Sequence, residues 1–342
     1  MSKQRNSNIE ALRVFLMLLI ILLHLSGEFF DIKEIRLYQN DITSSSVLSL
    51  RMIFVLGVNT FAFTSGYFGI KTTPPKQVYR KLIQYELLAL SWGFIIIILD
   101  VAVNGINMQH ILQLSLPTSS GVCWYFSAYM VLLAIAPLLN AGIEKLPKGQ
   151  YRLIIMFLFI VEFVGGMLFH ANGTTFMQLF LLYLLGRYIR IHGVKMLDDK
   201  AAILFFLSTL TNMTVVFVCS YWNVGGDSIV KIIESNRNPL VLISAISFFF
   251  MFKNFHKHIP LLSYISKLAP YMFSVYICHV CILYIGVIDF MEYVLVSPFV
   301  SLIIYSFATL FVCVALEKLR MVIMDKPIKK ISDYINYKFQ IS

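Results

Sequence analysis

Residues 9–30 read IEALRVFLMLLIILLHLSGEFF, an apolar run interrupted by only a few polar side chains. A helix needs roughly 20 such residues to cross the ~30 Å hydrocarbon core of a bilayer. Lys3 and Arg5 precede the run, as basic residues precede a secretory signal. The run is too long for a signal's apolar region, however, and no A-x-A-type cleavage site follows it. We therefore expect residues 9–30 to form an uncleaved first transmembrane span.

The composition of the whole chain has the same character. Of its 342 residues, 58% are hydrophobic and only 13% are charged, and the mean hydropathy is +0.78. Soluble domains are nearer one quarter charged, because a water-soluble fold needs a polar exterior. The chain is therefore expected to be an all-α, polytopic transmembrane helical bundle of about ten spans. The spans are expected near residues 9–30, 47–70, 82–101, 122–140, 152–170, 175–190, 201–222, 238–252, 264–287 and 298–318.

Lysine and arginine predict the orientation, because cytoplasmic segments are enriched in them. With the N-terminus inside, 22 of the 28 Lys and Arg residues fall in cytoplasmic segments and four in external loops. Arg13 and Arg51 fall inside spans. Both termini are then cytoplasmic, with a membrane domain over residues 1–320 and a basic tail over 321–342. The tail is either an amphipathic helix on the inner leaflet or a solvated basic end. Topology thus explains the net charge of +10, and no nucleic-acid partner is expected.

Two ionisable residues in the first span point to function, since such groups are costly inside a bilayer. Arg13 and His24 are eleven residues apart, which is ~1100° of helical rotation, within ~20° of three full turns. They therefore share one face of the helix and lie ~16 Å apart along its axis. A cation near the cytoplasmic mouth suits the phosphates of an anionic donor. A neutral imidazole can take a proton from a hydroxyl nucleophile. Alone, each residue also has a structural explanation: Arg13 snorkelling to the interface, and His24 making a packing contact.

The sequence around these residues resembles a known family. The segment from Arg5 to Arg13, with the apolar run to His24, resembles the opening of the bacterial membrane acyltransferase family 3. The hallmark of that family is Arg or Lys, ten residues, then His in the first helix. Further segments resemble the family in the same order: Asn59–Tyr67, Tyr79–Lys81, Cys123–Asn140 and Ser274–His279.

The resemblance implies an integral-membrane enzyme that acylates polysaccharides, lipids or small molecules from a cytoplasmic acyl-coenzyme A. It implies that His24 is the general base or a transient acyl carrier, and that Arg13 positions the donor or supports His24. Lys76, Arg80 and Lys81 would attract the coenzyme A phosphates. Many members carry an Arg-x-x-Arg pair in this loop, whereas here the second guanidinium is missing, so the role of each basic residue stays open.

Other polar residues have two readings each. His279 is a second proton carrier, or it holds Tyr276 or a neighbouring carbonyl. Trp124 and Tyr125 anchor the chain at the external interface or stack on an acceptor. Glu86 lies close to the cytoplasmic mouth and could pair with Arg80 or Arg13, whereas Glu162 lies deep and needs a partner. Ser65 is expected beside a close helix approach at Gly66, and Asn59 suits a helix–helix hydrogen bond. Arg51 could snorkel to the interface.

The chain carries no H-E-x-x-H motif, Walker loop, nucleophile elbow or dinucleotide fingerprint, and no bound metal or cofactor is expected. We expect a multi-pass protein of the bacterial cell membrane that moves an acyl group, in the first instance acetyl, from acetyl-CoA or another acyl-CoA to a glycan hydroxyl. The acceptor would be a cell-surface polysaccharide or a lipid-linked glycan. The alternative from another class is a transporter or flippase for a glycan or its lipid-linked precursor.

The topology is tested with reporter fusions. An even number of spans after a cytoplasmic N-terminus requires a fusion at Ser342 to report the inside and one near Asp227 to report the outside. The same signal from both positions contradicts the predicted orientation.

Overall fold

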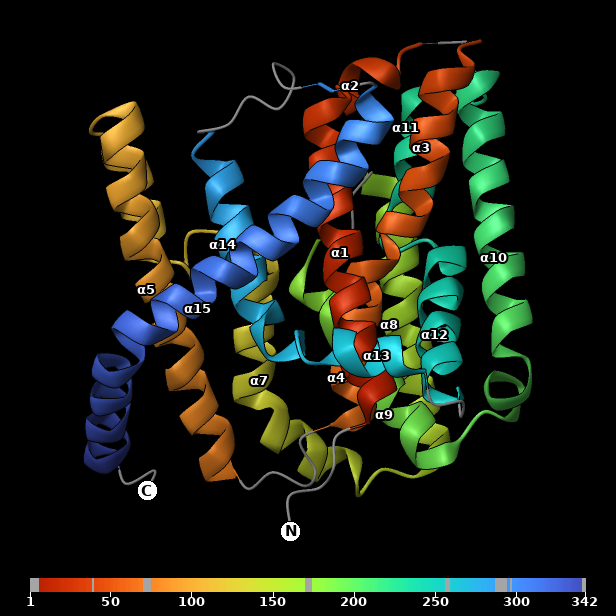
Figure 1. The fold of residues 1–342 in the computed structure, drawn as a ribbon. Helices are drawn as coiled ribbons and strands as arrows, with labels where there is room; N and C mark the ends of the chain where they lie inside the picture. The colour runs from red at the N-terminus through yellow and green to blue at the C-terminus, as the bar shows by residue number, and fades with distance from the viewer. Residues whose placement is uncertain are drawn as a thin grey trace. The chain divides into compact units, whose positions relative to one another are not determined.

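A computed structural model describes residues 6–38, 40–69, 75–169, 174–255, 259–286, 294–295 and 297–339; for Pro75 and residues 166–169 it describes the backbone alone. Within these ranges the ordered elements are helices, with no strand. The helices are α1 (Ser7–Phe29), α2 (Ile32–Ile35), α3 (Ile42–Phe54), α4 (Leu56–Phe68), α5 (Pro75–Asn104), α6 (Met108–Ser115), α7 (Trp124–Ile143), α8 (Lys148–Phe169), α9 (Phe176–His192), α10 (Lys195–Tyr221), α11 (Gly226–Glu234), α12 (Pro239–Lys253), α13 (Pro260–Ser266), α14 (Met272–Tyr284) and α15 (Pro298–Lys338), with a short 3₁₀ turn at Ala269–Tyr271 (Figure 1).

Seven stretches of the described chain are long and apolar enough to cross a membrane, which confirms the all-helical membrane fold. Each of the ten predicted spans overlaps a helix. The predicted spans at 152–170, 175–190 and 238–252 coincide with α8, α9 and α12, which are not among the seven. With 17 and 15 residues, α9 and α12 are shorter than the roughly 20 residues that a perpendicular span needs. The count of ten therefore stays a prediction.

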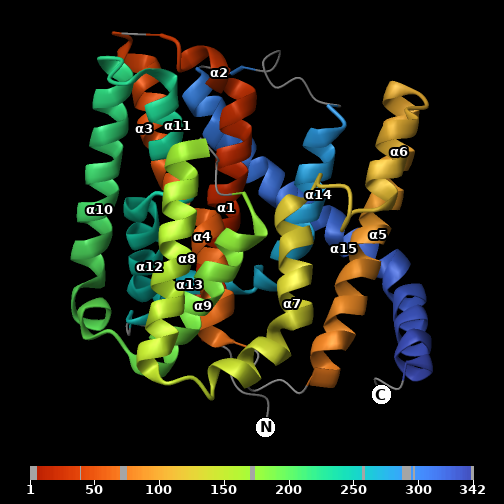
Figure 2. The same cartoon turned by 180° about the vertical axis from the view of Figure 1, so that it is seen from behind.

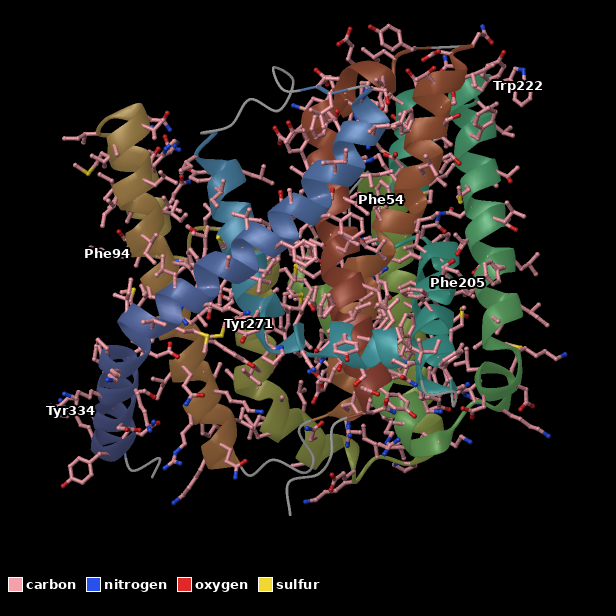
Figure 3. The ribbon with its side chains drawn as sticks, viewed as in Figure 1. Phe54, Phe94, Phe205, Trp222, Tyr271 and Tyr334 are labelled. Atoms are coloured by element: carbon pink, nitrogen blue, oxygen red, sulfur yellow. The ribbon has the colours of Figure 1, made fainter. Side chains whose placement is uncertain are left out.

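Large apolar side chains are exposed along the long helices. Phe94 on α5 is 59% exposed (Figure 3), and Ile203 and Leu210 on α10 are 64% and 65% exposed. Contiguous apolar surface of this kind leads to association in water. The acyl chains of a bilayer cover it instead, so the molecule is a membrane protein.

The chain folds into two compact units. Unit 1 comprises residues 1–68, 147–270 and 290–307, and unit 2 comprises residues 69–146, 271–289 and 308–342. Unit 1 therefore holds α1 to α4 and α8 to α13. Unit 2 holds α5, α6, α7, α14 and most of α15.

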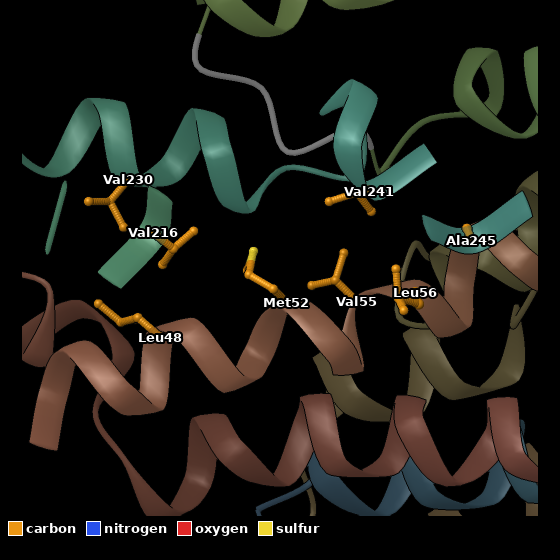
Figure 4. Close-up of a cluster of buried hydrophobic side chains, with 8 residues drawn as sticks. All are labelled: Leu48, Met52, Val55, Leu56, Val216, Val230, Val241 and Ala245. Carbon is orange, nitrogen blue, oxygen red and sulfur yellow. The ribbon is translucent and has the colours of Figure 1, made fainter. Parts of the chain in front are cut away.

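In unit 1, α10 is the support on which two other segments pack. One apolar cluster joins Leu48 and Met52 of α3 and Val216 of α10 to Val230 of α11 and Val241 of α12 (Figure 4). Both α11 and α12 thus bury apolar side chains against the same neighbours. Figures 1 and 2 show them one after the other along α10.

This arrangement changes the interpretation of residues 226–238. The sequence pattern places Asp227, Glu234 and Arg237 in an external loop. Glu234 is only 8% exposed, and the Arg237 side chain is 10% exposed, because α11 carries the chain into the unit before α12 begins. Glu234 and Arg237 are therefore buried in protein rather than exposed in a loop, and the external position of this segment stays a prediction. The short predicted span at 238–252 is preceded by α11, which buries Val230 and Glu234, and by a non-helical link of four residues.

The closest helix crossing in unit 1 depends on two glycines. A Cβ added to Gly66 of α4 would lie 2.2 Å from the carbonyl oxygen of Tyr183 on α9. A Cβ added to Gly186 of α9 would lie 2.5 Å from the carbonyl oxygen of Phe63. Small residues let the backbones of membrane helices approach closely. The expected close approach at Ser65 and Gly66 is confirmed, and its partner is α9.

In unit 2, the long helix α5 contacts α6, α7 and α14. The segment predicted as a basic tail is helical as far as Lys338, since α15 continues across position 320 with Pro327 inside it. Tyr334 on this part of α15 is 64% exposed (Figure 3).

Gly66→Ala is expected to separate α4 from α9. Overpacking of this kind typically costs about 1–3 kcal/mol, and here the obstacle is backbone that cannot rotate away. The variant should show a lower melting temperature in detergent and less protein in the membrane. Gly142→Ala on α7 is the control, since nothing lies within 4 Å of its added Cβ. Equal melting temperatures for the two variants would contradict the assigned crossing.

Candidate active site

His24 and Arg13 project from α1, an uninterrupted helix whose first turn is capped. The Asn6 side chain accepts a hydrogen bond from the backbone N–H of Asn8 at 2.9 Å, which satisfies a donor that the helix leaves unpaired. Both His24 and Arg13 are half-buried. Arg13 forms an ion pair with Glu10, Nη1 to Oε1 at 3.1 Å, with its side chain 37% exposed. This pairing within the first turns of α1 was not foreseen from the sequence.

A second guanidinium, that of Arg51 on α3, lies against the turn of α1 that carries His24. Arg51 Nη1 donates hydrogen bonds to the Ser26 hydroxyl and to the Leu23 carbonyl oxygen, the latter at 3.3 Å. The Arg51 side chain is 15% exposed. It therefore does not snorkel toward the interface, as the sequence allowed, but is directed into unit 1 at the level of His24.

Glu234, the last residue of α11, balances the charge of Arg51. Its Oε1 lies 4.0 Å from Arg51 Nε, and its Oε2 accepts hydrogen bonds from Arg36, whose Nε is 3.1 Å away. The Glu234 side chain is only 6% exposed. Removing a charge from water costs several kcal/mol per ion unless a partner compensates it. The array of Arg36, Glu234 and Arg51 thus keeps a compensated cation beside His24.

The link between α11 and α12 continues this polar interior. The carbonyl oxygen of Asn236 accepts hydrogen bonds from Asn59 Nδ2 at 2.8 Å and from Gln178 Nε2 at 2.9 Å. Asn59 therefore joins two segments by a hydrogen bond, as expected. Irregular backbone is tolerated at membrane depth only where it is buried in protein or lines a cavity, and the two amides supply that burial here.

On its other side the link is tied to α8. Arg237 Nε lies 2.8 Å from Glu162 Oε2, which gives Glu162 the partner that its depth requires. A pocket of about 160 Å³ adjoins this ion pair. Its lining residues are Phe163, Ile232, Ile233, Ser235, Arg237, Asn238 and Pro239.

The residues expected to bind the donor belong to unit 2. Lys76, Arg80 and Lys81 lie in the first two turns of α5 and are all exposed. They therefore form a basic turn in contact with the surroundings. Lys71, which the sequence groups with them, lies outside the described residues.

The residues of the Ser274–His279 motif on α14 have three different structural roles. His279 is 1% exposed, and its Nδ1 lies 2.7 Å from the carbonyl oxygen of Val275, which accepts the hydrogen bond. Of the roles considered for His279, the contact with a neighbouring carbonyl and a contact with Tyr276, ring centroids 5.9 Å apart, are both observed. Tyr276 packs edge-on against Tyr125, with ring centroids 5.9 Å apart. Trp124 and Tyr125 begin α7 and are half-buried.

Ser274, the first residue of that motif, belongs to a buried network that the sequence did not reveal. Ser274 and the Trp92 indole donate to Oε2 of Glu317. Arg320 pairs with the same carboxylate through Nε at 2.7 Å and Nη2 at 2.8 Å. The sequence pattern counts Arg320 among the cytoplasmic charges, yet it is only 4% exposed. This network joins α5, α14 and α15 of unit 2.

The remaining candidates make local contacts. Glu86 accepts a hydrogen bond from the Thr118 hydroxyl, so the contact seen in unit 2 is not with Arg80. Ser65 donates to the carbonyl oxygen of Phe61 on its own helix at 3.1 Å. Over the described ranges, no three His, Cys, Asp or Glu side chains gather closely enough to hold a metal ion.

Comparison with known proteins identifies the family. A family model of an acyltransferase domain, that of acyltransferase family 3, matches residues 6–318. The chain belongs to this family. The match covers α1 with Arg13 and His24, α5 with its basic turn, and α14 with its Ser-x-Tyr-x-x-His motif. Searches of curated proteins and of solved structures found no match.

The molecule is therefore a membrane acyltransferase that transfers groups other than amino-acyl groups. Family membership also favours an enzyme over the transporter or flippase considered from the sequence.

Proposed function

We propose that this acyltransferase moves an acyl group, in the first instance acetyl, from cytoplasmic acyl-coenzyme A to a hydroxyl of a cell-surface polysaccharide or lipid-linked glycan. We place it in the bacterial cell membrane. The observation that carries the proposal is the half-buried His24 of α1, on the turn that Arg51 contacts. A base can take the proton of the attacking alcohol, and a cation can stabilise the negative charge that develops in acyl transfer.

In the proposed reaction the acceptor hydroxyl oxygen attacks the thioester carbonyl carbon while its proton passes to His24. The carbon–sulfur bond then breaks, and the sulfur leaves with the electron pair. It takes up the proton from His24, so coenzyme A departs as a thiol. General-base assistance of this kind contributes about 10²–10⁴ in rate.

Arg51 is proposed to stabilise the negative charge that develops on the carbonyl oxygen. Fixed positive groups in a site of low dielectric act strongly on such a charge and need no reorganisation during the reaction. The hydrogen bonds to Ser26 and Leu23 and the ion pair with Glu234 hold the guanidinium in a fixed place.

Two other basic groups are proposed to serve the donor. The exposed basic turn of Lys76, Arg80 and Lys81 attracts the coenzyme A phosphates. Arg13 is 37% exposed beside Glu10, so it retains a surface to which a phosphate could bind. The missing Arg-x-x-Arg pair leaves a more diffuse attraction, since lysine acts as a point charge rather than a bidentate donor.

His24 is tested by two substitutions. His24→Ala and His24→Gln should both abolish measurable acyl transfer while the protein reaches the membrane in normal amounts, because neither residue can accept the proton. The measurement is esterification of the surface glycan per amount of membrane protein. His192→Gln is the control, since His192 is also half-buried in unit 1 and lies at the far end of α9.

A purely structural His24 predicts the opposite order. Glutamine keeps the hydrogen bonding and much of the volume, so it would be tolerated, whereas alanine would reduce the amount of protein. Near-parental activity of His24→Gln would remove His24 from the mechanism.

The donor site is tested by neutralising the basic turn. Replacing Arg80 and Lys81 together with Gln should raise the donor KM at low salt and leave kcat almost unchanged. The effect should shrink as salt rises, because exposed charges are screened over ~10 Å at 0.1 M. The matched control replaces Lys329 and Lys330, an exposed pair on α15, and should leave the donor KM unchanged. An equal response of the two double variants would refute the assignment.

A further inference from the structure

The end of α5 opposite to the basic turn forms a helical hairpin with α6. Gly105 turns the chain in the left-handed region, with φ +78°, and the Asn107 side chain caps α6 by accepting from the N–H groups of Gln109 and His110. The helix then packs closely on α5, since a Cβ added to Gly93 would lie 2.2 Å from the Leu114 carbonyl oxygen. The first turn of α6 is thereby held against the last turns of α5.

This hairpin brings together a carboxylate and an imidazole. Asp100 of α5 is fully buried, and its Oδ2 lies 3.0 Å from Nδ1 of His110. Its Oδ1 accepts a hydrogen bond from Asn104 Nδ2 at 2.8 Å. Asn104 also donates to the carbonyl oxygen of Ile285, at the end of α14. Both oxygens of the carboxylate are thus engaged, which fixes its position.

The contact fixes the tautomer of the neutral His110 ring. A carboxylate accepts hydrogen bonds, so Nδ1 carries the proton, and in the neutral imidazole Nε2 is then the acceptor. The His110 side chain is 23% exposed, so a molecule from outside can reach the ring. The Tyr284 ring of α14 also faces the imidazole, with ring centroids 5.0 Å apart.

A second acceptor atom lies one helical turn further along α6. Residues three apart share a helix face, which puts Gln113 beside His110. Gln113 Oε1 is buried and has no hydrogen-bond donor in the part of the chain that the structure describes. A buried acceptor without a donor is costly, so the half-buried Gln113 side chain would gain a hydrogen bond by rotating toward a ligand hydroxyl beside His110.

From these contacts we propose that the hairpin of α5 and α6 is a binding subsite for a neutral, hydroxyl-rich ligand. Two neighbouring hydroxyls of a sugar would donate to Nε2 of His110 and to Oε1 of Gln113. Asp100 acts through His110 as a positioning residue. This inference rests on the proposed function, since it takes the ligand to be the glycan acceptor.

The location of the hairpin suits an acceptor better than the donor. Asp100 follows Lys76 by 24 and Lys81 by 19 residues of continuous helix, a rise of ~28–36 Å. That matches the ~30 Å of a hydrocarbon core. The subsite and the basic turn thus occupy opposite ends of a span. An anionic coenzyme A also has no cation to meet at this hairpin, where Asp100 supplies the fixed charge.

The experiment measures steady-state kinetics of the full-length protein in proteoliposomes. The probes are labelled acetyl-coenzyme A and the de-esterified surface polysaccharide of the source cell. His110→Ala and Gln113→Leu should each raise the KM for the polysaccharide about 3- to 10-fold, the effect of one neutral hydrogen bond. The kcat and the donor KM should stay within about twofold. Gln109→Ala, an exposed neighbour on α6, is the control.

Asp100→Asn separates positioning from mere packing. Asparagine keeps the size of the side chain but can donate to Nδ1, which would move the ring proton to Nε2 and remove the acceptor. The variant should therefore raise the polysaccharide KM as His110→Ala does. An unchanged polysaccharide KM in all three variants overturns the subsite. A lower kcat together with a higher donor KM and less membrane protein overturns it as well, because the substitutions would then damage the whole protein.

A binding measurement distinguishes failure of the subsite from failure of the proposed function. His110→Cys should react with a membrane-impermeant maleimide, and the polysaccharide should slow that reaction, whether or not acetyl transfer occurs. The parent protein serves as the blank for its own cysteines. Protection without any acyl transfer would count against the proposed function alone, and transfer without protection would overturn the subsite.

Discussion

A charge carried into a bilayer must find its partner within the protein, because the lipid around it offers neither water nor counter-ion. Three buried ion pairs of this chain follow from that constraint: Arg51 with Glu234, Arg237 with Glu162, and Arg320 with Glu317. The first two connect segments that are distant in sequence: α3 with α11, and α8 with the link before α12. The third is joined to α5 and α14 through Trp92 and Ser274. The charges therefore fix which helices meet.

The same constraint shapes the region around His24. A lone arginine at its level would be unstable, so Arg51 is present together with Glu234, and Glu234 is present together with Arg36. The carboxylate comes from α11, a helix that enters unit 1 and ends there. The link that follows needs Asn59 and Gln178 to satisfy its backbone. The segment formed by α11, the non-helical link and α12 thus supplies the carboxylate that pairs with Arg51 beside the proposed base.

In unit 2, the length of α5 separates two kinds of surface. Its first turns are basic and exposed, and its last turns carry the carboxylate of Asp100. The proposed donor site lies at one end of this single helix and the proposed ligand subsite at the other.

The sequence by itself determined the class of fold, the family, and the placement of Arg13 and His24 on one face of the first helix. Apolar runs reveal spans because bilayer thickness sets their length, and the spacing of Arg13 and His24 is local to α1. The tertiary structure alone decided the partners: Arg51 lies against the turn of His24, Arg320 is buried with Glu317, and Glu234 is buried between two arginines. Asp100 and His110 showed only as isolated polar residues until the hairpin joined them. Which side chains pair depends on how the helices pack, and contacts between residues 225 positions apart, such as Trp92 and Glu317, leave no periodic signal in the chain.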